Sequence, residues 1–175
     1  GWIAGVESEL VRPARLLLLV KNHAGYLRLC DLLTQAYLGP RSRGRAEVTR
    51  AALAAGDNAG LIALSGAALG DVGQALLTGN GALAEKLAGE WARLFRDSYY
   101  LELQRYGQPQ AEALVAASVA LAGKLGLPVV ATHPVQFLQR EDFKAHEARV
   151  CIAEGYVLSD ARRPRVFTEE QYFKS

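Results

Sequence analysis

Three histidines, His23, His133 and His146, are the side chains of this sequence best suited to metal-dependent chemistry. His23 and His133 each follow a short apolar run typical of a strand, so both are candidates to reach one edge of a sheet. With a carboxylate such as Asp71 or Glu102 beside them, they could hold a cation that activates water. The tighter signatures H-x-H and D-x-H are absent, so loop histidines bonded to the backbone are the alternative. His146 falls inside a predicted helix, which favours a structural or surface role.

Nucleophilic catalysis has little support in the sequence. Ser65 precedes Gly66, but no G-x-S-x-G elbow surrounds it. Cys30 and Cys151 fall within apolar helical patterns, which is typical of small core residues. They lie 121 positions apart and form no CxxC pair, so neither a disulfide scaffold nor a structural zinc site is expected. The glycines of residues 66–73 match no phosphate-binding pattern and are interpreted as turn residues.

Arginines gather in two loops, and such clusters can neutralise nucleic-acid phosphates or pair with acids of an adjoining domain. A solvated loop is the simpler alternative. The two clusters are Arg41, Arg43 and Arg45, and Arg162, Arg163 and Arg165.

The elements that would position these residues alternate between apolar strands and amphipathic helices. Such alternation predicts an α/β fold with parallel strands, in which chemistry occurs at the carboxyl ends of the strands. The expected strands are 15–20, 61–64, 99–103 and 127–132. Strand 15–20 is entirely apolar apart from Arg15, so we expect it to be buried on both faces. The expected helices are 26–38, 50–55, 72–77, 82–95, 110–125, 141–153 and a short one from Thr168. Because helix 110–125 is apolar on most sides, we expect it to be packed in a crowded layer. Four strands are too few for a closed barrel, so the sheet is open or further residues complete it.

Composition limits the class of protein. Half of the 175 residues are hydrophobic and 22% are charged, which favours a packed core over disorder. The net charge of +2 does not by itself indicate a nucleic-acid binder. The longest apolar run, Leu16 to Val20, is far shorter than a membrane span, and no signal peptide is visible. The sequence begins without an initiator methionine and contains no methionine at all, and we expect it to be a piece of a longer cytoplasmic protein.

Five segments in a fixed order carry a family resemblance. They are KNHAGYLRL (21–29), GLIALSG (60–66), LGDVGQALLTGN (69–80), YLELQRYGQP (100–109) and the stretch 125–175. The series resembles the alpha (catalytic) subunits of bacterial DNA polymerase III, in the later part of their N-terminal polymerase and histidinol phosphatase (PHP) domain. The resemblance implies an incomplete, distorted (β/α)7 barrel. Residues 1–175 would be its later portion, with 156–175 leading toward the polymerase core.

The resemblance also implies that metal ligands have been lost. Intact family members read Asp-x-His where this sequence has Pro134 and Gln136, and often have Cys and His at the positions of Ala67 and Arg15. Proline and alanine side chains offer no lone pair, arginine is always charged, and glutamine is a weak ligand for transition metals. We therefore expect a metal-free module with no cofactor of its own.

The function implied by the resemblance is DNA replication by the parent DNA-directed DNA polymerase, a nucleotidyltransferase that uses magnesium ions in another domain. This segment would be non-catalytic, bracing the polymerase core and docking the proofreading exonuclease subunit. DNA, the sliding clamp and other holoenzyme subunits would be bound through the parent, and no membrane would be involved. Two alternatives stay open. One is a metal-dependent phosphoesterase or 3'-5' exonuclease with His23 and His133 as substitute ligands, and the other is a DNA-contacting surface built from the arginine clusters.

Overall fold

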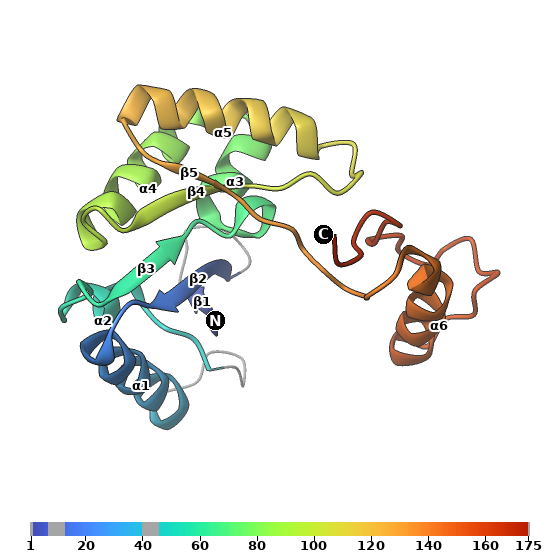
Figure 1. The fold of residues 1–175 in the computed structure, drawn as a ribbon, viewed down its shortest axis with the longest axis horizontal. Coiled ribbons are helices and arrows are strands. Elements are labelled where there is room, and N and C mark those ends of the chain that lie inside the picture. Colours follow the sequence, from blue (N-terminus) through green and yellow to red (C-terminus); the bar gives the residue numbers. More distant parts are fainter. Residues whose placement is uncertain (1, 7–12, 40–45, 175) are drawn as a thin grey trace. The chain divides into compact units, whose positions relative to one another are not determined.

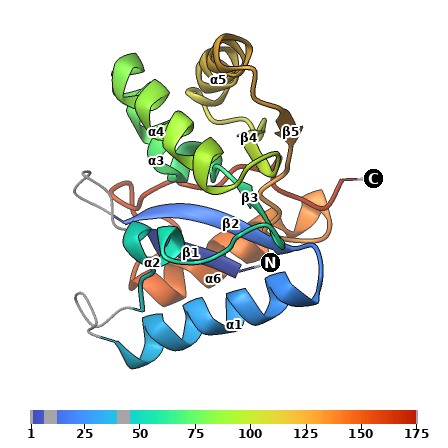
Figure 2. The same cartoon turned by 90° about the vertical axis from the view of Figure 1, so that its left-hand side faces the viewer.

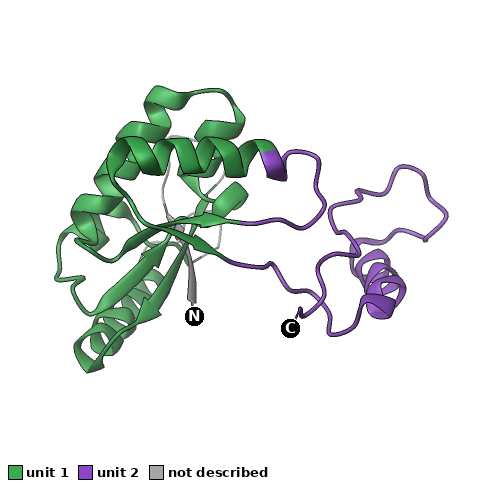
Figure 3. Ribbon diagram, turned by 45° about the horizontal axis from the view of Figure 1, so that its top comes forward, with its two compact units in different colours: residues 1–103, 113–131 green, residues 104–112, 132–175 purple. Residues whose placement is uncertain are grey.

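A computed structural model describes the backbone of residues 2–6 and the full residues 13–39 and 46–174. The chain forms two compact units (Figure 3). Unit 1 comprises residues 1–103 and 113–131, and unit 2 comprises residues 104–112 and 132–175.

Unit 1 is built on a five-stranded sheet, and helices lie between consecutive strands from the second to the fifth (Figure 1). Its strands are β1 (Trp2–Val6), β2 (Ala14–Val20), β3 (Leu61–Leu64), β4 (Tyr99–Leu103) and β5 (Val129–Ala131). Its helices are α1 (His23–Leu38), α2 (Arg50–Ala54), the 3-10 turn η1 (Ala67–Leu69), α3 (Asp71–Leu77), α4 (Gly81–Leu94) and most of α5 (Ala111–Leu125). Figure 2 shows α1 and α2 beside β2, with α3, α4 and α5 beside β4 and β5.

The strand directions correct the prediction of an entirely parallel sheet. The strand order is β1-β2-β3-β4-β5, and β3, β4 and β5 are parallel as predicted. However, β2 runs antiparallel to both β1 and β3. The prediction was wrong for β2 because hydrophobic periodicity identifies helices and strands but carries no information about strand direction. The helices α1 and α2 between β2 and β3 have the same sequence pattern as helices that connect parallel strands.

Side-chain caps explain where several helices begin. Asn22, Thr49 and Asn80 each accept a hydrogen bond from the backbone N–H three residues on, satisfying a donor that the first helical turn leaves free. The cap at Thr49 was predicted. The cap at Asn22 makes α1 begin at His23, three residues before the predicted start, so His23 is a helical residue rather than a loop residue.

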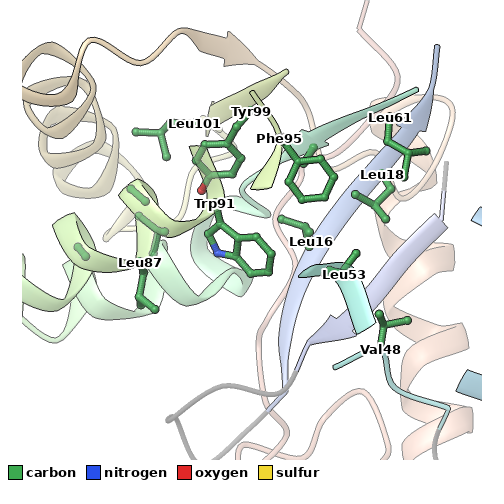
Figure 4. Packing of buried hydrophobic residues seen from close by; sticks show 14 of the residues in the cluster. Leu16, Leu18, Val48, Leu53, Leu61, Leu87, Trp91, Phe95, Tyr99 and Leu101 are labelled. Atoms are coloured by element: carbon green, nitrogen blue, oxygen red, sulfur yellow. The ribbon is translucent and has the colours of Figure 1, made fainter. Parts of the chain in front are cut away.

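One face of the sheet carries the core of unit 1. Leu18 pairs with Ala63, and Ala63 pairs with Tyr99, so these three buried residues form one row across β2, β3 and β4. Trp91 and Phe95 are among the largest buried side chains packed in the same cluster (Figure 4). Buried residues from α1 to α5 join this cluster.

Two predictions of burial were wrong. We expected β2 to be buried on both faces, but its residues alternate: Leu16 and Leu18 are buried, whereas Leu17 and Leu19 are only half-buried. We also expected α5 to be surrounded, because it is apolar on most sides. It buries one face, and Val119 on the other side is 48% exposed. In both cases the element has more apolar side chains than the rest of unit 1 covers.

Unit 2 contains the 3-10 turn η2 (Arg140–Asp142) followed by α6 (Phe143–Glu154). An isolated parallel bridge joins Phe137 to Tyr172. The helix predicted from Thr168 is wrong, because residues 168–171 form a turn closed by the Gln171 N–H and the carbonyl of Thr168 at 3.2 Å. The Gln171 side chain accepts from the amide of Thr168 at 2.9 Å, and this bond holds the turn in place of a helix.

Candidate functional site

The reversed direction of β2 separates residues that were expected at one edge of the sheet. The edge at which β3, β4 and β5 end is called the carboxyl edge here, and β2 ends at the opposite edge. Lys21 confirms this: its amide donates to the carbonyl of Gly60, before β3, and its Nζ donates to Ser98, before β4. His23 follows β2 and therefore begins α1 away from the carboxyl edge. It is exposed and stacks on Tyr26, with ring centroids 6.2 Å apart.

Two of the positions that the resemblance assigns to lost ligands lie together at the carboxyl edge. Arg15, near the start of β2, and Ala67, at the start of η1, are brought close by Gly66. A Cβ added at Gly66 would lie 2.3 Å from the carbonyl oxygen of Arg15. Gly66 also has φ +77°, which favours glycine and lets the chain turn from β3 into η1. The Arg15 side chain is exposed and Ala67 is buried.

Glu102 and Ser65 are buried at the same edge and hold the loop after β3. The Glu102 carboxylate accepts from the amide of Gly66 at 2.6 Å, and the Ser65 hydroxyl oxygen accepts from the amide of Glu102 at 2.9 Å. Ser65 is 4% exposed, so this hydroxyl is a structural link and not an accessible nucleophile. The carboxylate that the sequence suggested as a possible ligand is thereby engaged by the backbone.

A polar network that the sequence analysis missed surrounds Asp71. Arg50 forms an ion pair with Asp71 and a second one with Glu90 at 2.7 Å. The Trp91 indole N–H donates to both oxygens of Asp71 at 3.1 and 3.0 Å, and the Arg50 guanidinium lies 4.4 Å from the centre of the Trp91 ring. Asp71 is therefore a buried linker between α2, α3 and α4, whereas its residue type had suggested a possible metal ligand. Because these residues lie up to 41 positions apart, no local pattern could have revealed the network.

Burial at this network also affects Tyr99. Its hydroxyl group is buried and has no hydrogen-bond partner among the described residues. Burial foremost, and then the negative charge of Asp71, raise the pKa of Tyr99 well above its ordinary value of 10. The phenol therefore stays neutral and acts as a core side chain.

In unit 2 the remaining predicted positions are tied to the C-terminal segment. His133 Nε2 lies 2.7 Å from the carbonyl oxygen of Glu170, which makes that nitrogen the donor. The carbonyl of Pro134 accepts from the side chain of Gln171 at 3.1 Å, and the amide of Gln136 donates to the carbonyl of Gln171 at 2.8 Å. Gln171 is 3% exposed and is a further structural residue that the sequence analysis missed.

His146 is the buried histidine of unit 2, which fits the structural role predicted for it. Its ring lies between Phe137 and Phe167, with centroid distances of 5.3 and 4.6 Å. Nδ1 accepts from Arg149 at 3.1 Å, and Nε2 has no hydrogen-bond partner among the described residues. Burial foremost, and then the charge of Arg149, lower the pKa of His146. Cys151 is buried as predicted, whereas Cys30 is only partly buried, and both are free thiols.

Internal ion pairs engage two of the three arginines in the C-terminal cluster. Arg162 pairs with Asp160 at 2.9 Å and lowers the pKa of that carboxyl. Arg163 pairs with Glu147 at 2.8 Å and has a side chain only 11% exposed. Arg165 is exposed. The other cluster, Arg41, Arg43 and Arg45, lies outside the described residues.

The side chains present do not fit a divalent cation at the positions that the resemblance assigns to ligands. At the carboxyl edge, Ala67 provides no donor atom and Arg15 is a fixed cation. In unit 2, Pro134 provides no side-chain donor and the Gln136 side chain is exposed. Within residues 13–39 and 46–174, no group of three or more His, Cys, Asp or Glu residues is placed to hold a metal ion.

Comparison with known families assigns the fold. Residues 2–106 match the family model described as PHP domain, and the chain belongs to this family. Over 93% of its length it is 56% identical to the DNA polymerase III subunit alpha of Neisseria meningitidis serogroup A. It is 42% identical over 99% of its length to the protein of that name from Pseudomonas aeruginosa, and 42% identical over 91% to that from Escherichia coli K12.

The chain covers only a small part of these relatives. It spans 14% of the Neisseria and Escherichia proteins and 15% of the Pseudomonas protein.

Of the helices in the described residues, none is long and apolar enough to cross a membrane. The expected α/β class with parallel strands is confirmed for β3, β4 and β5, whereas the seven-unit barrel and the extent of the domain over residues 1–175 stay predictions.

Proposed function

We propose that this chain is the PHP segment of the alpha subunit of a bacterial replicative DNA polymerase, and that the segment is a metal-free structural module that docks the proofreading exonuclease subunit. The observation that carries the proposal is the 42–56% identity to DNA polymerase III alpha subunits over more than nine tenths of the chain. The parent protein would act in the cytoplasm, and its magnesium-dependent nucleotide transfer would occur in another of its domains. DNA, the sliding clamp and other holoenzyme subunits would bind the parent as a whole.

The arrangement of the carboxyl edge supports the non-catalytic part of the proposal. Two acids of the described residues that could have served as ligands are engaged internally: Glu102 holds the loop after β3, and Asp71 binds Arg50 and Trp91. A carboxylate that already pairs with a guanidinium must lose that pair before it can bind a cation. The same edge presents Arg15, whose charge repels cations.

Metal analysis of the full-length protein tests this part. We expect no bound zinc or manganese after dialysis, and no 3'-5' degradation of a primer beyond background. The rival phosphoesterase hypothesis predicts stoichiometric metal that is lost in the double variant His23→Ala, His133→Ala. This rival is weakened because β2 directs His23 to the edge opposite the one where β5 ends.

Binding of the exonuclease subunit to the full-length protein tests the docking part. Three surface variants sample different elements at exposed apolar side chains, namely Tyr26→Glu on α1, Val119→Glu on α5 and Ile152→Glu on α6. Docking by this segment predicts that at least one variant weakens binding about tenfold or more, since a charge at an apolar contact is costly. Primer extension by each variant controls for folding. Unchanged affinity in all three variants and after deletion of residues 1–175 would rule docking out.

A further inference from the structure

Two large apolar side chains of unit 2 are exposed at neighbouring points of the backbone. Leu138 is 70% exposed and Phe173 is 66% exposed. Each directly follows one member of the parallel bridge between Phe137 and Tyr172. The amide of Phe173 donates to the carbonyl of Phe137 at 3.0 Å, so the peptide group that precedes Leu138 contacts the backbone of Phe173. We call these two side chains the terminal patch.

The backbone that carries the terminal patch is fixed on both sides. The buried Gln171 binds the carbonyl of Pro134 and the amide of Thr168. Lys174 forms an ion pair with Glu170 at 2.7 Å, and its Nζ lies 5.0 Å from the centre of the Tyr172 ring. A surface held in this way loses little conformational freedom when it is covered, which favours binding.

The position of the patch in the chain indicates what covers it. Alpha subunits that resemble this chain are about seven times as long, because the chain spans 14% of their length. Polypeptide that continues past residue 175 is tethered within two residues of Phe173. Tethering by so short a linker gives an effective concentration in about the millimolar range, above that of a separate partner.

We propose that the segment immediately following residue 175 in the longer protein packs on Leu138 and Phe173, and so fixes the PHP segment to the next part of the chain. This inference rests on the proposed function only in taking the chain to be part of a longer polymerase subunit. It does not require the exonuclease to dock on this segment.

Photo-crosslinking in the full-length protein tests the inference. The amino acid p-benzoylphenylalanine replaces Phe173 in one sample and Leu138 in another, with Ile152, 82% exposed on α6, as the matched control position. We expect irradiation to join position 173 and position 138 to peptides that follow residue 175 in the same molecule. The mass of the intact protein then stays unchanged, and peptide mapping identifies the link.

Other products would overturn the inference. A link from position 173 to a second copy would double the mass of the protein, and a link to added exonuclease subunit would increase it by the mass of that subunit. Either product would assign the patch to that partner. Links to the exonuclease would support docking while refuting the intramolecular contact, so the two proposals fail separately. An absence of links to the following segment at positions 138 and 173, in protein that still extends primers, also refutes it.

Trypsin provides a second readout in the full-length protein, because it cleaves after Lys174, next to the patch. The double variant Leu138→Ser, Phe173→Ser is expected to be cleaved there about tenfold faster than the parent, since the covered state loses buried apolar area. Ile152→Ser should leave that rate unchanged. Equal rates in the parent and the double variant would contradict the packing.

Discussion

Buried polar side chains in this protein act as internal links, and Asp71 is the clearest case. It is 3% exposed and binds Arg50, the Trp91 indole and the amide of Val72. Removing one member of a buried ion pair leaves the other charge uncompensated. The carboxylate is therefore valuable to the fold even though the sequence presents it as a potential catalytic acid.

Replacing Asp71 by alanine should destabilise α3 and α4 by about 3–5 kcal/mol, because Arg50 and Trp91 lose their shared acceptor. Hydrogen exchange of these helices in the full-length protein measures the change as a lower free energy of opening. Arg105→Ala is the control, since the Arg105–Glu112 pair is exposed on both sides and such pairs contribute about 0–1 kcal/mol. Equal effects of the two substitutions would show that the Asp71 network does not stabilise the core.

His146 makes the stability of α6 depend on pH. Burial and Arg149 lower its pKa in the folded state, whereas the unfolded chain has the ordinary value of about 6.5. The unfolded state therefore binds the proton more readily, and stability that is complete above pH 6.5 is lost as pH falls toward the lowered folded value. Arg149 and Glu147, on the same helix, affect this pKa with opposite signs, and Phe137 and Phe167 flank the ring.

Proteolysis of residues 140–165 in the full-length protein, between about pH 7.5 and pH 5, would detect this loss as faster cleavage at the lower pH. In the variant His146→Gln, which has no titrating ring, cleavage should vary much less over the same range after correction for protease activity. His23→Gln, at an exposed histidine, should retain the full pH dependence. A pH-independent rate in the unmodified protein would refute the prediction.

At the scale of elements, the sequence allowed most helices and strands to be located but not the direction of every strand. Strand 99–103 was predicted with the bounds that it has, and the Thr49 cap was found because a side-chain cap is a local signal. The antiparallel course of β2 was missed because direction is set by long-range pairing, here of Leu18 with Ala63. For the same reason the candidate site was predicted only in part: the loop after β3 was located correctly, but the bonds of Asp71 and Gln171 are long-range.

A close backbone contact fixes the start of α1. A Cβ at Gly25 would lie 1.9 Å from the carbonyl oxygen of Gly60, so the helix can approach the loop before β3 only with glycine there. Gly25→Ala should therefore cost about 1–3 kcal/mol or more. Gly89→Ala, at a helical glycine of α4 where an added Cβ would meet nothing within 4 Å beyond its chain neighbours and its own helix backbone, should instead stabilise by about 0.5–1 kcal/mol. Hydrogen exchange of α1 and α4 in the full-length protein would measure both, and a neutral Gly25→Ala would refute the contact.

At the scale of the whole molecule, the two faces of the sheet in unit 1 are covered unequally. The helices pack on the face that carries Leu16 and Leu18, while Leu17 and Leu19 on the other face stay half-buried. A sheet with helices on both faces, or one closed into a barrel, would bury these residues. Because the chain spans 14% of its Neisseria relative, further polypeptide is available to cover this second face.

The 175-residue chain produced alone should consequently self-associate, because an apolar sheet face and the open edge of β5 remain available for pairing. Light scattering across a concentration series would detect this as a mass that rises with concentration, with the full-length protein as the reference. Leu17→Lys together with Leu19→Lys should shift the isolated chain toward the monomer, since charges on an open face oppose pairing. Val119→Lys on α5 adds one charge outside the sheet and should have less effect. An isolated chain that is monomeric and melts cooperatively would show that the second face needs no cover, and would argue against a barrel completed by other residues.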